Sequence, residues 1–381
     1  PIKYNNAIYY PKREYINVFL CYIRNMIWRG FRVFLVVIFV ALLCRACLVK
    51  DVPTSKYTIK TSTNEELSIS YPTPKNVTIN GVDYLESQAP IGKFGGEMIE
   101  STIGEGPKTF NPFNCKDNIS SQLSSVMYDG LLTSDPITGQ PIPKLAKSFS
   151  ISPDGKTYTI KLRHGVKWSD GKPITADDVV FTWRDIIFAG LGDTSTRDSL
   201  VIDDKLPTVK KIDDYTVIFT TPKPFAPFIR MLSTSIAPKH FFISAVKNGG
   251  VDFDTFLSTN TNPSDFVVSG AFKLKEYVPA QRVVFERNPN YYEINKKGEK
   301  LPYLNRLVFL IVGDLNNEVL KFEAKELDII SLQGSKVARY KAIEPHSDFK
   351  LYNLGPTTGT MYLSLNLNNR TNKKGTFYVD P

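Results

Sequence analysis

The chain has 381 residues, enough for about two or three domains, and its hydrophobic content of 42% is typical of a globular protein, which excludes disorder as the default. The net charge of +9 lies mostly near the N-terminus, because residues 1–50 hold eight Lys and Arg against one Glu. The rest of the chain is nearly neutral and has no basic face in its pattern, which argues against a nucleic-acid-binding protein.

Residues 26–47 have the pattern of a secretory signal peptide. Arg29 and Arg32 precede an apolar core at 33–43, which is too short to cross a bilayer as a helix, since a span needs about 20 residues. Because this segment begins with a methionine, residues 1–25 are predicted to be translated upstream sequence (read-in) rather than part of the native signal peptide.

Two cysteines, Cys44 and Cys47, directly follow the apolar core. A cysteine at this place is typical of a lipoprotein, so one of the two is expected to be lipidated. The alternative is a cleaved signal and a free periplasmic protein. The C-x-x-C spacing also occurs in redox and zinc sites, but a second ligand pair is absent from the pattern. Cys115, alone in the rest of the chain, is expected to be a small buried apolar residue.

Residues 48–93 are rich in Thr, Ser, Asn and Lys and predict a tether. As a flexible coil, a segment of this length reaches roughly 35 to 40 Å. Within it, Asn80-Gly81 lies between the alternating residues of 77–84, which is the pattern of a tight hairpin. The tether is therefore expected to carry a small ordered ribbon.

The body of the chain begins with a short predicted strand at 95–100 and an irregular loop at 104–112. The loop lacks the last glycine and the Lys-Ser/Thr ending of a phosphate loop. Apolar residues at helical spacing then predict a helix over 120–132, packed on the strand.

Residues 153–183 combine four structural signals without a gap. A turn, an alternating strand, a second turn and an apolar helical stripe follow one another at 153–156, 157–163, 169–173 and 175–187. Thr175, with Asp178 three residues on, has the pattern of a capping box at the start of the helix. These signals predict one compact unit.

The next segments predict a strand at 215–219, a short helix after 224–228, and two β runs at 269–274 and 281–289. A βαβ unit follows, in which a strand at 307–312, a helix capped by Asp314 and a strand at 328–330 come in that order. Its right-handed crossover implies a parallel sheet, which we place in a second lobe. Residues 361–367 alternate again and predict one more strand.

Several of these segments resemble one protein family. The stretch DGKTYTIKLRHGVKWSDGKPITADDVVFTW at 154–183 resembles the signature of the bacterial extracellular solute-binding proteins of the oligopeptide and dipeptide type, family 5, which serve ABC importers. Matching motifs stand in the family's order at 128–131, 145–149, 269–274 and 285–289. The resemblance spans roughly 95–381.

The resemblance implies an α/β, two-lobed periplasmic-binding-protein-like fold with mixed sheets. Residues 94–275 would form the first lobe, with a flanking subdomain at about 123–240. Residues 276–381 would begin a second lobe, which is incomplete here. Because the family continues from this point into a long helix, the chain is expected to stop within a domain.

The resemblance also marks candidate ligand-binding residues. In the family, the first strand and the following loop reach the ligand cleft, which makes Glu105, Gly106, Pro107 and Thr109 ligand neighbours. From the residues alone, a glycine-permissive loop without a ligand explains the pattern equally well. Phe272 stands where the family commonly has Tyr, and ligand contact and core packing have equal weight for it.

The implied function is capture of peptides between two lobes and delivery to the permease subunits of an ABC importer, by a monomer held at the membrane through a lipid anchor. Changing the ratio of closed to open molecules from about 1:99 to 99:1 requires the ligand to bind the closed state more favourably by about 5.5 kcal/mol. Both lobes must therefore contact the ligand. In peptide-binding members, the acidic residue that pairs with the ligand's α-ammonium would follow Pro381. We therefore expect this chain alone to be unstable or to bind poorly.

Two other functions remain open: the same fold binding nickel, haem or an oligosaccharide, and a surface adhesin or sensor. An enzyme is not predicted. The three histidines, His164, His240 and His346, are isolated in sequence, and the paired carboxylates suit turns and helix caps. No catalytic residue, cofactor or metal site is expected.

Overall fold

The computed structural model describes residues 75–135 and 138–354. The predicted signal peptide, Cys44 and Cys47, and the predicted strand at 361–367 lie outside them. Contacts divide the described residues into two units, 75–330 and 331–354. The second contains α10 (Gly334–Ile343) and the 3-10 helix η3 (Glu344–His346). In the part of the chain that the structure describes, no helix has the length and apolar character needed to cross a membrane.

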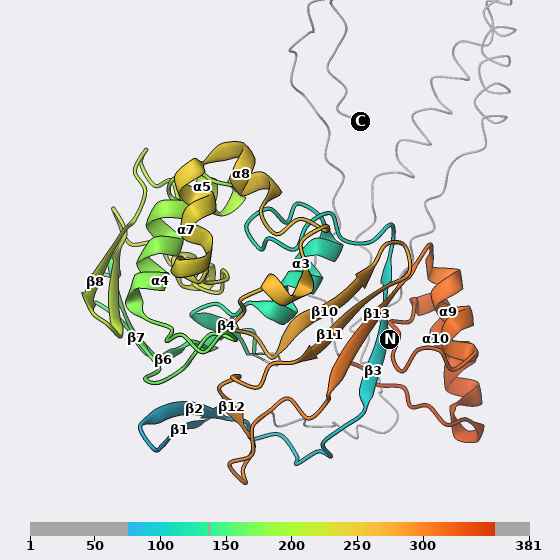
Figure 1. Ribbon diagram of the computed structural model, residues 1–381. Coiled ribbons are helices and arrows are strands. Elements are labelled where there is room, and N and C mark those ends of the chain that lie inside the picture. The colour runs from blue at the N-terminus through green and yellow to red at the C-terminus, as the bar shows by residue number, and fades with distance from the viewer. Residues whose placement is uncertain (1–74, 136–137, 355–381) are drawn as a thin grey trace, which may run out of the picture. The chain divides into compact units, whose positions relative to one another are not determined.

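The first unit contains a four-stranded mixed sheet with the order β10-β11-β13-β3 (Figure 1). Its strands are β3 (Glu97–Ile103), β10 (Phe272–Val278), β11 (Arg282–Arg287) and β13 (Arg306–Val312). The pairs β10-β11 and β11-β13 are antiparallel, whereas β13 runs parallel to β3 along its full length. The expected boundary at 275/276 between a first and a second lobe falls within β10.

Helix α9 (Leu315–Glu323) follows β13, as predicted, and Asp314 caps it by accepting hydrogen bonds from the backbone N–H groups of Asn316 (2.7 Å) and Asn317 (3.0 Å). The predicted strand at 328–330 is absent. Of these three residues, Asp328 is hydrogen-bonded to β3. Its N–H donates to the carbonyl of Ile99, and the N–H of Ile99 donates to the Asp328 carboxylate and not to its backbone carbonyl. One such residue pair does not extend into a ladder.

A second four-stranded sheet, β6-β7-β9-β8, is entirely antiparallel. It consists of β6 (Ala146–Ile151), β7 (Thr157–Leu162), β8 (Thr208–Asp213) and β9 (Thr216–Thr220). The predicted strand at 157–163 and the helix after it are confirmed. Both bonds of the capping box between Thr175 and Asp178 start α4 (Ala176–Phe181), which continues as the π-helix η1 (Thr182–Ile187).

Shorter elements connect the sheets. They are α3 (Asn118–Met127), β4 (Leu132–Ser134), β5 (Pro141–Pro143), α5 (Ser195–Ser199), α6 (Phe228–Met231), α7 (Lys239–Asn248), α8 (Gly250–Thr255) and the 3-10 turn η2 (Pro263–Asp265). Two apolar cores result. One surrounds Trp168 and Trp183 beneath the antiparallel sheet, and the other surrounds Phe285 and Phe309 of the mixed sheet.

The expected hairpin is present as β1 (Lys75–Ile79) and β2 (Val82–Glu86). Asn80 (φ 50°) and Gly81 (φ 80°) both adopt positive φ, as a two-residue turn of this kind requires. However, β2 also pairs with β12 (Glu293–Ile294), and Leu85 is buried in the core. The hairpin therefore belongs to the folded body, so the segment of the predicted tether from 75 onward is not a free coil.

Candidate functional site

The candidate site lies at one edge of the mixed sheet. Strands β3 and β13 run in the same direction, and β10 shares it because both β10 and β13 are antiparallel to β11. The carboxyl ends of all three strands therefore meet at one edge. In open α/β sheets, ligands bind outside this edge. The loop at 104–112 leaves β3 there (Figure 1).

Two glycines shape the first turn of this loop. Gly104 (φ 135°) and Gly106 (φ 101°) adopt backbone angles that residues with side chains rarely take. A Cβ on Gly106 would lie 2.9 Å from Cδ1 of Ile311 and 3.3 Å from the hydroxyl of Tyr277. The missing side chain lets the loop lie directly on the ends of β13 and β10.

The backbone of this turn is largely unpaired. Within residues 75–135 and 138–354, the N–H groups of Glu105 and Gly106 and the carbonyls of 104–107 form no hydrogen bond. Gly106 is buried, and a buried backbone group without a partner costs free energy. The next two N–H groups, of Lys108 and Thr109, both donate to the hydroxyl of Ser120. The turn thus offers donors and acceptors to a ligand, while the loop behind it is anchored.

Tyr277 joins the site through an irregularity in β10. The register with β11 shifts between Leu274 and Glu276, which turns the side chain of Tyr277 toward the core. Its ring packs edge-on against that of Phe110, with the two ring centroids 5.6 Å apart. Its hydroxyl forms no hydrogen bond with any described residue, and burial raises its pKa. Our sequence reasoning missed Tyr277. The adjacent charged residues Lys275 and Glu276, which interrupt the alternation, are the signal that could have revealed the bulge.

The structure separates the predicted site residues into two groups. Glu105 is exposed, and Gly106 and Pro107, although buried, lie in the same unpaired turn. Thr109 faces inward: its hydroxyl donates to the carbonyl of Leu257 (3.4 Å) and accepts from the N–H of Asn111 (3.1 Å).

Phe272 is 8% exposed and belongs to the core around Phe285. This burial favours the packing role that we weighed equally with ligand contact. No cluster of three or more potential metal ligands occurs among the residues that the structure describes.

The mixed and antiparallel sheets with their connecting helices define an α/β protein. The chain belongs to the bacterial extracellular solute-binding proteins, family 5: residues 140–377 match the model of the middle part of that family. This membership confirms the predicted resemblance and agrees with the prediction that the chain is not an enzyme.

Three comparisons illustrate the likeness. A probable ABC transporter-binding protein of Deinococcus radiodurans is 35% identical over 242 residues, which cover 62% of this chain and 40% of that protein. A periplasmic alpha-galactoside-binding protein of Rhizobium meliloti is 30% identical over 226 residues, 56% of this chain and 32% of that protein.

The structure of the oligopeptide-binding protein AppA of Bacillus subtilis in complex with a nonapeptide is similar, with a TM-score of 0.53 and 27% identity over 66% of this chain and 46% of that one. This confirms the predicted fold class over the matched part. The chain spans about a third to a half of the length of these relatives.

Proposed function

We propose that this chain is the part of an ABC importer's substrate-binding protein that captures peptides along the carboxyl edge of the mixed sheet. The observation that carries the proposal is the unpaired backbone at 104–107. An extended peptide carries N–H and C=O groups along its length, which can donate to and accept from the free backbone groups of this turn. The relative AppA was solved with a nonapeptide, which supports this ligand class.

Each residue of the site has a proposed role. Gly106 offers its N–H and carbonyl groups, which have no partner among the described residues. The hydroxyl of Tyr277, beside Gly106 and without a partner in the described chain, donates to a peptide carbonyl. The exposed carboxylate of Glu105 attracts basic side chains or an ammonium group, and Pro107 stiffens the turn. Thr109 and Phe272 support the loop and the sheet from behind.

An oligosaccharide is the second candidate ligand, because one relative is an alpha-galactoside-binding protein. Sugars are held chiefly by side-chain hydrogen bonds and aromatic faces, whereas the groups without partners here are mostly backbone groups. The peptide is therefore favoured.

Delivery to a permease and anchoring at the membrane are parts of the same proposal. After export, one of Cys44 and Cys47 would carry the lipid and hold the domain at the outer face of the membrane. Metabolic labelling with a fatty acid tests this: one of the variants Cys44→Ala and Cys47→Ala should lose the label. Labelling that survives the double variant would refute the anchor.

Ligand class is tested by NMR titration, which detects even the weak binding expected of this chain alone, with short peptides and, separately, with an alpha-galactoside. We expect peptides to shift the amide resonances of Glu105 and Gly106, and Tyr277→Phe to weaken binding about three- to tenfold. Tyr128→Phe is the matched control, because the hydroxyl of Tyr128 likewise forms no hydrogen bond with a described residue but is buried in the apolar core rather than lying at the turn. Shifts of the same amides by the galactoside alone would overturn the peptide proposal.

A further inference from the structure

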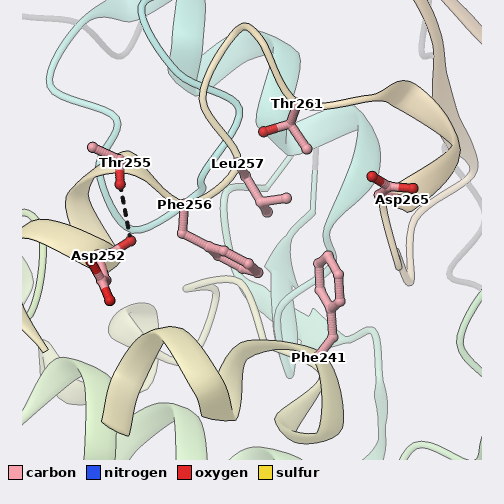
Figure 2. A pocket seen from close by; sticks show the side chains of 7 residues that line it. All are labelled: Phe241, Asp252, Thr255, Phe256, Leu257, Thr261 and Asp265. Atoms are coloured by element: carbon pink, nitrogen blue, oxygen red, sulfur yellow. Dashed lines mark hydrogen bonds between the residues drawn. The ribbon is translucent and has the colours of Figure 1, made fainter. Parts of the chain in front are cut away.

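A second feature of the first unit is a hollow between α7, α8 and η2. It is a cavity of about 360 Å³ (Figure 2). Two aromatic rings form part of its wall: Phe241 and Phe256 are half-buried and tilted against each other, with their centroids 5.1 Å apart. This volume is within the usual range for small-molecule sites, roughly 300 to 1,000 Å³.

Two carboxylates border the aromatic pair. Figure 2 shows Asp252 and Asp265 on opposite sides of it, one from α8 and the other from η2. Both are exposed, and neither forms an ion pair with any residue in the described ranges. Asp265 accepts one hydrogen bond, from the hydroxyl of Ser264 (3.2 Å). The cavity therefore carries two negative charges separated by an apolar surface.

One wall of the cavity is fixed from behind. Leu257 has a φ of 55°, unusual for a residue with a side chain, and its carbonyl accepts hydrogen bonds from the N–H of Phe110 (2.9 Å) and the hydroxyl of Thr109 (3.4 Å). These bonds tie the wall to the segment that follows the proposed peptide-binding turn. The wall is preorganised, so a ligand does not have to order it.

We propose that this cavity binds an organic dication of the α,ω-diaminoalkane class. Its two ammonium groups pair with Asp252 and Asp265, and its hydrocarbon chain crosses Phe241 and Phe256, whose ring faces also attract cations. A monoamine can form an ion pair with only one of the two carboxylates, and an uncharged diol forms an ion pair with neither. Because exposed ion pairs are individually weak and screened by salt, the dication has a modest advantage that is lost at high ionic strength.

The test is calorimetric or NMR titration of the full chain with 1,5-diaminopentane, n-pentylamine and 1,5-pentanediol at low ionic strength. We expect the diamine to bind about three- to fivefold more tightly than the monoamine, and the diol not to bind. Asp252→Asn and Asp265→Asn should each abolish that advantage. Asp254→Asn is the matched control, because Asp254 is exposed on the same helix but does not line the cavity.

Several outcomes would overturn the proposal. Equal affinity for diamine and monoamine would show that the two carboxylates do not act together. If Asp254→Asn reduced the affinity for the diamine as much as the two cavity variants do, the attraction would be a non-specific one to an acidic surface. Binding of an arginine-containing peptide without binding of the diamine would assign the cavity to a protein partner instead.

Discussion

Lys144 is the centre of a network of charges and hydroxyls with little exposure to solvent. Its ammonium group forms an ion pair with Glu293, lies 3.8 Å from Oδ1 of Asp129, and donates to the hydroxyl of Tyr291 (2.8 Å). Tyr292 donates to the other oxygen of Asp129 (2.8 Å). Burial lowers the pKa of Lys144, but Asp129 and Glu293 raise it more, so the amine stays charged at neutral pH.

Replacing Lys144 with methionine keeps an unbranched side chain, shorter by one atom, and removes its charge. The side chains of Lys144 and Asp129 are only 18% and 12% exposed, so two carboxylates would be left near each other with little access to water. Removing one member of a buried ion pair costs about 3 to 5 kcal/mol. For a folded body of this size, that loss lowers the melting temperature by about 6 to 20 °C.

Urea and thermal unfolding of the variant measure this loss. Lys161→Met is the control, because Lys161 is exposed on β7, and it should change the unfolding free energy by less than about 0.5 kcal/mol. Adding Asp129→Asn and Glu293→Gln to Lys144→Met should restore part of the stability, since no uncompensated charge remains. A loss below about 1 kcal/mol for Lys144→Met alone would refute the reasoning.

Three further predictions concern the hairpin, the loop and the sheet. Burial raises the pKa of Asp83, but hydrogen bonds from Thr78, the N–H of His164 and Lys147 lower it more, from 3.8 to about 2. The ionised carboxylate therefore stabilises the folded state by about 2 kcal/mol above pH 3.8, and this contribution is lost as the pH falls toward about 2. Between these pH values, the unfolding free energy measured in urea should fall more steeply for the wild type than for Asp83→Asn. Gly106→Ala should destabilise the fold by about 1 to 3 kcal/mol because of its positive φ, and equal stability in thermal unfolding would contradict the loop geometry. Phe272→Tyr should cost about 1 to 3 kcal/mol, because the added hydroxyl would be buried without a partner, and should leave peptide binding unchanged; improved binding in the titration would favour the ligand-contact role instead.

Features encoded by neighbouring residues could be predicted from the sequence. The hairpin turn at Asn80-Gly81 requires two positive φ angles, which these residue types tolerate, and the structure has both. The capping box of Thr175 and Asp178 depends on residues three positions apart, and both of its bonds form. In each case the residue that prefers the conformation and the residue that it bonds or pairs with are within a few positions of each other in the sequence.

Features that depend on distant partners could not be predicted in this way. Nothing near β13 indicates that its parallel neighbour is β3, about 200 residues earlier, so the lobe boundary was placed between them. The contact of β2 with β12 is equally distant, and without it the hairpin resembled part of a tether. Period-two alternation along β10 also places Tyr277 on the wrong face, because the bulge before it reverses the sides of the strand.

The parallel pairing of β3 with β13 is what creates the candidate site. It places Gly106, which follows β3, against Ile311 near the end of β13, and the antiparallel turn through β11 adds Tyr277 from β10. The proposed ligand-binding turn needs a glycine at position 106 and leaves much of its backbone unpaired, both of which weaken the fold locally. At position 106 both stability and the proposed binding therefore depend on glycine, because a side chain there would strain the backbone and press against Ile311 and Tyr277. By contrast, Tyr277→Phe should weaken the proposed binding with almost no loss of stability.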